Sequence, residues 1–270
     1  MRLARPAILG AALLVAPAAA GAAPAVELAP HRAVYTLDLA KVRESRHITD
    51  VDGEMTFTWQ DVCDGWTLRY RTELSLAFAD RPGQRLGWSY SAWEGDSGDR
   101  FRFFLRRFND GGETLRRRGE ARITPDAAGT ATLQGTEPKE VSLPAGTLFP
   151  TRHTRAIIAA ARAGEPFHYA EVFDGTGDSG GLFAASAAIT GARPPETSPP
   201  LDSPLLTGQR SWRVDLAFYP PAPGDATPQS EQSLRLYANG VAGDMRLDYR
   251  DFVLDAVLSE VEALPRPECG

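Results

Sequence analysis

The chain has little cysteine and little histidine, and both shortages narrow the chemistry it can perform. Its 270 residues include two cysteines, Cys63 and Cys269, and four histidines. Two cysteines are too few for a four-thiolate zinc site or for a densely cross-linked secreted module. The histidines show no metal-ligand spacing such as His-Glu-x-x-His. We therefore expect neither a metal site nor a cofactor.

Positive charge is also scarce. The sequence holds 29 basic and 35 acidic residues, for a formal net charge of −6, and only Lys41 and Lys139 among the basic residues are lysines. Proteins that bind nucleic acid need a net cationic surface to neutralise phosphates. The charge balance therefore argues against nucleic acid as a partner.

Long apolar runs are absent except near the start. Arg2 and Arg5 precede an apolar stretch over residues 7–20, and Ala18 and Ala20 form the small-x-small pattern of a signal-peptidase site. The stretch is shorter than the ~20 residues of a spanning helix, so it indicates a secretory signal peptide over residues 1–20. We expect residues 21–270 to be exported, with no transmembrane segment.

Export changes how the two cysteines are interpreted, because exported chains meet an oxidising compartment. A bridge between Cys63 and Cys269 would close a loop of 269 − 63 = 206 residues and would hold the two ends of the mature chain together. Two free buried thiols are the alternative. The bridge favours a single domain over residues 21–270.

Alternation of apolar and polar residues predicts a mainly β protein. Short alternating runs bounded by Gly, Asp, Asn or Pro recur along the chain, as in the segment 67–78, where Leu68 and Tyr70 face away from Arg69 and Arg71. The segment 150–164 breaks this pattern and predicts one helix, capped by Thr151 or Thr154 and ended by Gly164. Many strands and one helix indicate an antiparallel sheet that curls or closes.

Between these elements the sequence predicts turns and loops. An acidic, glycine-rich turn is expected over residues 94–99, and Asn239-Gly240 is a type I′ hairpin signal. The stretch 191–208 contains five prolines and is expected to be a long exposed loop. The tail over 245–264 fits either two strands or one amphipathic helix, and we favour two strands.

One segment resembles a catalytic motif. Gly177-Asp178-Ser179-Gly180-Gly181 matches the sequence around the nucleophile of trypsin-like proteases, and His47 is the histidine best placed by chain order to serve as base. However, Gly95-Asp96-Ser97-Gly98 repeats the tetrapeptide in another expected turn. A serine hydrolase that uses Ser179 is therefore a remote alternative, and turn composition is the simpler explanation.

Arginines and tryptophans suggest two kinds of surface. The run Arg116-Arg117-Arg118 lies within an expected strand, where it is either a solvated outer face or a docking patch for an acidic partner or anionic headgroups. If the sheet curls, the tryptophans that are not in the core would line a concave site for an apolar ligand or a peptide.

A set of short motifs resembles the EipB family, the periplasmic cell-envelope integrity proteins of alphaproteobacteria. The set comprises Asp61-Val62-Cys63-Asp64-Gly65-Trp66, the segment Phe149-Pro150-Thr151-Arg152-His153-Thr154 leading into residues 159–165, Phe173-Asp174-Gly175, and a cysteine near the C-terminus. The resemblance implies a β-spiral wound around the helix, a Cys63–Cys269 bridge, and periplasmic partners that include tetratricopeptide-repeat proteins. No catalytic residue carries over from it.

From these observations we expect a non-enzymatic periplasmic protein that supports envelope integrity through protein partners. A carrier of lipid or lipoprotein acyl chains is the alternative, and it requires an apolar cavity that opens to solvent. Beyond the two cysteines, the residues expected to serve a structural role or a partner site are Asp64, Gly65, Trp66, Thr151 and His153.

Overall fold

Alternating inward and outward side chains build one long antiparallel sheet in the computed structural model, which describes residues 25–43, 47–124, 127–135, 138–177, 180–197, 199–221, 227–249 and 251–269. The expected signal peptide lies outside the described residues. The first eight strands are β1 (His31–Val42), β2 (Ile48–Asp61), β3 (Gly65–Phe78), β4 (Gln84–Gly95), β5 (Arg100–Asn109), β6 (Gly112–Arg122), β7 (Gly129–Gly135) and β8 (Lys139–Leu143). After the helix α1 (Pro150–Ala163) come β9 (Phe167–Phe173), β10 (Leu182–Arg193), β11 (Ser211–Tyr219), β12 (Ser230–Tyr237), β13 (Ala242–Asp248) and β14 (Phe252–Ala263).

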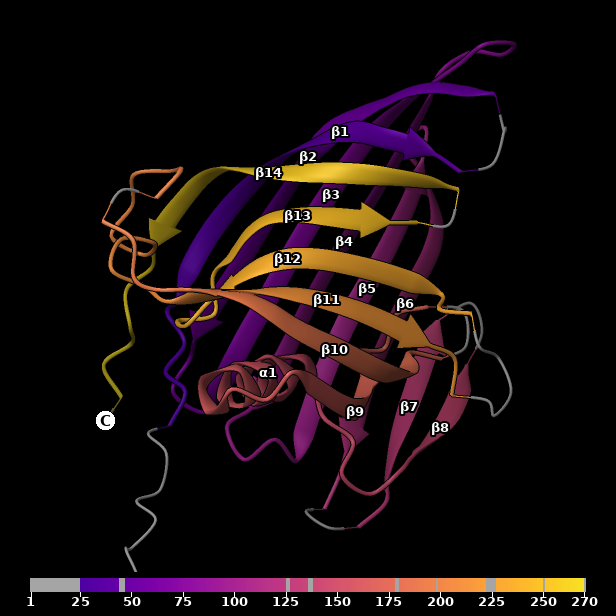
Figure 1. The fold of residues 1–270 in the computed structure, drawn as a ribbon. Helices are drawn as coiled ribbons and strands as arrows, with labels where there is room; N and C mark the ends of the chain where they lie inside the picture. Colours follow the sequence, from indigo (N-terminus) through magenta and orange to yellow (C-terminus); the bar gives the residue numbers. More distant parts are fainter. Residues whose placement is uncertain are drawn as a thin grey trace, which may run out of the picture.

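The strands follow the order β8-β7-β6-β5-β4-β3-β2-β1-β14-β13-β12-β11-β10-β9, so every pair of neighbours except β1 and β14 is also consecutive among the strands of the chain. The sheet curls until β10–β14 face β2–β6, and α1 lies at one end of the space between them (Figure 1). This confirms the expected mainly β fold, a curled antiparallel sheet packed around one helix. The expected pair of C-terminal strands is also confirmed, as β13 and β14.

The pairing of β1 with β14 joins the two halves of the sheet. The register runs from His31 opposite Ala263 to Val42 opposite Phe252. Near this seam, Cys63 and Cys269 form the expected disulfide, with their Cα atoms 5.6 Å apart. The two ends of the folded region are therefore held together both by strand pairing and by a covalent bond.

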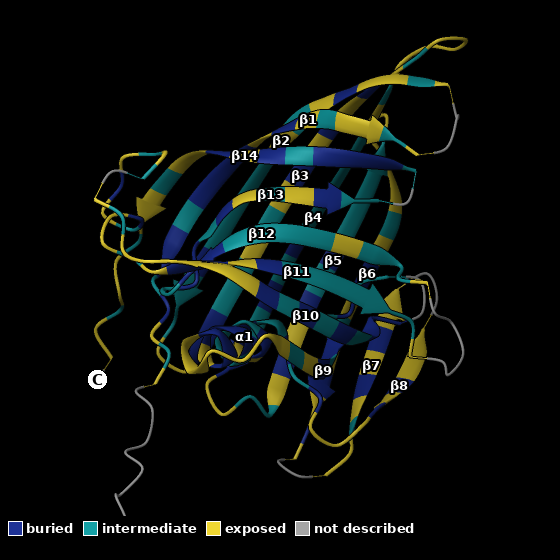
Figure 2. Cartoon of the chain, in the orientation of Figure 1, coloured by how far each residue is buried: buried dark blue, intermediate teal, exposed yellow. Residues whose placement is uncertain are grey.

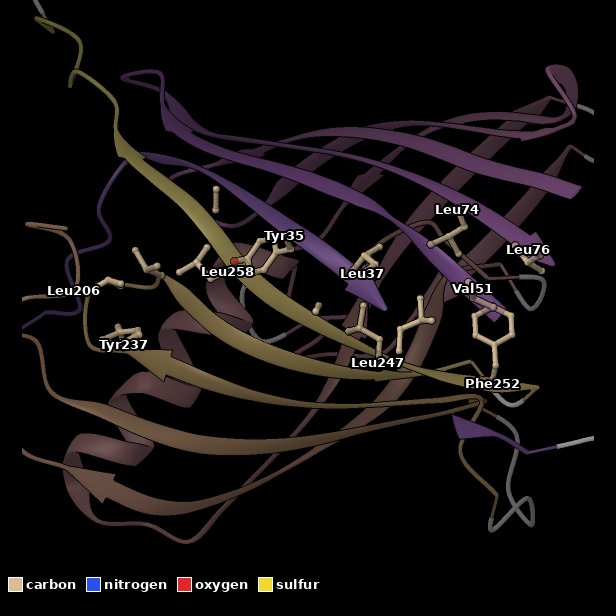
Figure 3. Close-up of a cluster of buried hydrophobic side chains, with 14 residues drawn as sticks. Tyr35, Leu37, Val51, Leu74, Leu76, Leu206, Tyr237, Leu247, Phe252 and Leu258 are labelled. Carbon is tan, nitrogen blue, oxygen red and sulfur yellow. The ribbon is translucent and has the colours of Figure 1, made fainter. Parts of the chain in front are cut away.

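Buried residues, dark blue in Figure 2, recur along the strands all around the curl and form the core. One cluster of buried side chains connects β1–β3 with β13 and β14, and its members include Tyr35, Leu37, Leu74, Leu247 and Leu254 (Figure 3). Because these residues come from both ends of the chain, packing between them supports the same seam as the disulfide.

The segment that follows β9 packs against the inner side of β4–β6 and closes the curl. Arg117 on β6 is buried and donates to the carbonyl oxygen of Gly177 at 2.6 Å, while the Tyr90 hydroxyl donates to the carbonyl oxygen of Asp174 at 2.6 Å. A Cβ atom added at Gly175 would lie 2.2 Å from the Phe103 ring, so only glycine fits there. The middle arginine of the run at 116–118 is thus part of the interior.

Three local expectations are corrected. Glu94 lies in β4 and not in a turn, because the strand continues to Gly95. The stretch 191–208 is only partly an exposed loop, since β10 extends to Arg193 and Leu206 is 2% exposed where it packs on the sheet. The turn at Gly240 has one positive φ, of 89°, instead of the two that a type I′ turn requires.

We expect the disulfide to stabilise the fold by about 2–4 kcal/mol, because it closes a long loop in the unfolded chain. Reducing the bridge, or replacing both cysteines by Ser, should lower the melting temperature by several degrees, as followed by circular dichroism. Reductant should leave the double variant unaffected. An unchanged melting curve after mass spectrometry shows the bridge to be broken would contradict a stabilising disulfide.

Candidate functional site

A cavity of about 900 Å³ lies inside the curled sheet and is partly open to solvent. One wall comes from the first half of the sheet and includes Met55, Leu86 and Leu105, and the opposite wall comes from β11–β13 and includes Phe218, Leu234 and Leu247. Pro150 and Thr154 of α1 also line it. The volume falls within the roughly 300–1,000 Å³ that is typical of small-molecule sites.

Aromatic rings shape the interior of this cavity. Trp88 on β4 and Tyr249, in the turn between β13 and β14, meet edge to face with ring centroids 5.9 Å apart. Tyr70 stacks on Tyr90 at 4.9 Å. This partly confirms the expectation for the tryptophans: Trp88 lines the cavity, whereas Trp66 is in the core.

A few polar groups are set among the apolar walls. Tyr70, Tyr249, Arg107 and Asp174 all line the cavity. Burial raises the pKa of Tyr249 to about 12 and that of Asp174 to about 6. The hydroxyls of Tyr70 and Tyr249 have no hydrogen-bond partner among the described residues, so they are donors available to a ligand.

A second buried feature holds the start of α1. The carboxylate of Glu94 accepts hydrogen bonds from the backbone N–H groups of Thr151 at 2.7 Å and Arg152 at 2.9 Å. The N-cap residue, Phe149, makes no side-chain cap. The expected cap by Thr151 or Thr154 is therefore wrong, because a carboxylate from β4 already satisfies the first free N–H groups of the helix.

The motif at residues 61–66 lies next to Glu94, the residue that holds the start of α1. Gly65 lies opposite Gly95 on β4, and a Cβ atom added there would lie 2.2 Å from the carbonyl oxygen of Glu94. Asp64 accepts a hydrogen bond from Trp93 Nε1 at 3.3 Å. The motif therefore brings β3 close to β4 at the position where Glu94 reaches α1.

Trp66, Thr151 and His153 also lie at this end of the molecule. Trp66 is 4% exposed and contacts Trp59, whose Nε1 donates to the Thr151 hydroxyl at 3.3 Å. His153 is buried with its ring centroid 5.8 Å from that of His168, and burial lowers its pKa to about 4. These contacts describe a packed joint between helix and sheet.

The remaining candidates from the sequence concern hydrolysis and metal binding. Ser179 lies outside the described residues, so the hydrolase alternative stays untested by the structure. His47 is exposed, with its Nδ1 atom 3.2 Å from Asp80. Within the described ranges, no group of three or more His, Cys, Asp or Glu side chains could hold a metal ion.

Comparison with known proteins assigns the chain to a family. A family model described as EipB-like matches residues 22–265. The chain belongs to the EipB-like family. It is 29% identical over 251 residues to the cell envelope integrity protein EipB of Brucella abortus (strain 2308), a match that covers 90% of this chain and 87% of that protein.

A solved structure supports the same assignment. A crystal structure titled as a beta-barrel-like protein of domain of unknown function DUF1849, from Brucella abortus, superposes on this EipB-like protein with a TM-score of 0.80 at 26% identity. The match covers 89% of this chain and all of the other. Over the part that the structure describes, no helix is long and apolar enough to cross a membrane.

Sequence reasoning did not find the polar residues of the cavity or the helix anchor in this EipB-like protein. Strand alternation placed Tyr70 on the face opposite Arg69, but it could not show that this face borders an open space. Glu94 appeared to belong to a turn because Gly95 and Asp96 follow it. The signal that could have revealed the helix anchor is the position of Glu94, an acidic residue that continues the apolar face of a predicted strand.

We expect Glu94 to make stability depend on pH. Burial raises its pKa from 4.5 to about 7, so the folded state keeps this proton when the unfolded state has lost it. The stabilisation is full below about pH 4.5 and is lost as the pH rises through 7, on the order of 3 kcal/mol in all. The free energy of unfolding, measured with urea between about pH 4.5 and 7, should therefore depend less on pH for Glu94→Gln than for the wild type.

The difference between wild type and variant isolates Glu94, because His153 and Asp174 titrate in both proteins. The matched control is Glu120→Gln, which removes an exposed carboxyl from β6 and should leave the pH profile unchanged. Parallel profiles for the wild type and Glu94→Gln would contradict a buried, proton-holding carboxyl.

Proposed function

We propose that this EipB-like protein supports the integrity of the cell envelope from the periplasm, by binding and not by catalysis, and that the cavity holds the acyl chain of an envelope lipid or lipoprotein. The relative in Brucella abortus carries the name of an envelope integrity protein. The signal peptide expected over residues 1–20 supports the location.

The proposal of an acyl-chain ligand rests on the cavity. An acyl chain needs a long apolar surface, and the two walls of the sheet supply it together with α1. Each methylene group moved from water into such a site contributes about 0.8 kcal/mol, so a chain of ordinary length has ample driving force. Tyr70, Tyr249 and Arg107 supply the few polar contacts that a headgroup or ester requires.

Association with periplasmic proteins is the second candidate, and an exposed patch on the edge strand favours it. Phe167 and Tyr169 on β9 are 71% and 64% exposed, and they lie two residues apart on the outward face. Large aromatic side chains left in solvent are typical anchors of protein interfaces. Acyl-chain binding and partner binding use different surfaces and are compatible.

Filling the cavity should weaken acyl-chain binding. We expect Leu86→Trp, which places a large ring in the cavity, to weaken binding of a fluorescent long-chain fatty acid by at least about tenfold, because displacing two methylene groups already costs that much. Native mass spectrometry of the protein purified from its own periplasm should show the added mass of a lipid in the wild type and not in the variant.

The matched control is Val257→Trp, which adds the same ring to an exposed position on β14 that is 49% exposed. It should bind the fatty acid as the wild type does. Equal binding by the wild type and Leu86→Trp, with both proteins folded, would show that the cavity does not hold the chain.

The second candidate has its own test. We expect Phe167→Ala/Tyr169→Ala to lose periplasmic proteins that cross-link to the wild type in cells, while fatty-acid binding is unchanged. An identical cross-linking pattern would exclude this patch as the contact surface.

A further inference from the structure

The outer face of β3–β6 carries most of its charge in one sign. Successive side chains on these strands point alternately into and away from the interior. The charged side chains that point away from it are nine arginines and three glutamates: Arg69, Arg71, Arg85, Arg100, Arg102, Arg106, Arg116, Arg118 and Arg122, with Glu73, Glu113 and Glu120. We call this surface the arginine face. It has an excess of six positive charges, in a chain whose formal net charge is −6.

Ion pairs do not cancel this charge. Glu113 bonds to both Arg106 at 2.6 Å and Arg116 at 2.8 Å, and Glu73 pairs with Arg71. Arg69 has no acidic partner within the described part of the chain. The neighbouring strand β2 adds acidic residues beside Glu73, at the end of the face away from Arg102.

A shallow pocket of about 270 Å³ lies in this face. Its lining includes the side chains of Arg69, Arg71, Ser89, Ser91 and Phe104. The Arg69 guanidinium and the serine hydroxyls supply donors that suit a phosphate group, which accepts bidentate hydrogen bonds from arginine. Arg71 adds positive charge to the pocket while it donates to Glu73. The small serines leave room where larger side chains would fill the surface.

Aromatic side chains are interleaved with the arginines. Phe104 lies half-buried beside the pocket, and Trp93 lies beneath Arg100 and Arg102, whose guanidinium carbons are 5.4 and 4.9 Å from the ring centroid. Aromatic rings set among arginines are typical of surfaces that meet the headgroup region of a bilayer.

We propose that the arginine face docks onto an anionic phospholipid bilayer, with the phosphate of one lipid bound in the pocket between Arg69, Arg71 and Ser91. The match of charge between this face and an anionic leaflet supplies the attraction. This site lies on the side of the sheet opposite the interior cavity, so it is independent of acyl-chain binding there.

The test is flotation of the full mature protein with vesicles of phosphatidylcholine, with or without phosphatidylglycerol. We expect binding only to vesicles that contain phosphatidylglycerol, and a steep loss of binding as salt rises. Arg69→Gln/Arg71→Gln should weaken binding by about thirtyfold, because each arginine near an anionic surface changes affinity roughly fivefold.

The control is Arg213→Gln/Arg246→Gln, which makes the same change of charge on the outer face of β11 and β13 and should bind as the wild type does. Equal weakening by the two double variants, or equal binding to both kinds of vesicle, would overturn the proposal. Ser91→Asp keeps every arginine but adds a carboxylate to the pocket, so binding equal to the wild type would contradict the phosphate position. Melting curves establish that each variant is folded.

Discussion

A buried carboxyl group on one strand holds the start of the helix, and the shape of the interior follows from that position. Glu94 accepts two backbone N–H groups at the start of α1, which an isolated helix would leave without partners. Because Glu94 is near the end of β4, the helix is held inside the curl of the sheet and not on its outside. Its side chains then close one end of the space that the strands enclose, and the cavity is what remains open.

The alternation of side chains along each strand separates two surfaces with different chemistry. The inward face of β3–β5 supplies Leu68, Tyr70 and Leu105 to the cavity, while the outward face of the same strands supplies Arg69, Arg71 and Arg106 to the arginine face. An apolar ligand and an anionic membrane would thus be contacted from opposite sides of one sheet. Such an arrangement suits a protein that works beside the membrane and handles lipid.

The fold was largely predictable because its elements carry strong local signals. Alternation predicted most strands, and Pro150 and Gly164 marked the ends of the helix correctly. The alternation pattern does not predict β10, because its many alanines give no difference in polarity between the two faces of the strand. Of the candidate site, the cysteine bridge, the motif around Gly65 and a tryptophan in the cavity could be anticipated from the sequence. Glu94 and Arg117 could not, since their hydrogen-bond partners lie 57 and 60 residues away. Tyr70 could not, since the cavity that it lines is closed by strands from the other half of the sheet.

The sequence by itself determined the class of the protein: a cysteine pair able to close the chain, a β-rich pattern with one helix, and a charge that argues against nucleic acid. These are properties of composition and short-range periodicity, which act before the chain folds. Only the tertiary structure decided that the sheet curls far enough for its halves to face each other. Whether inward side chains then meet and fill the space or leave a cavity depends on distances between strands remote in sequence, and no local pattern encodes those distances.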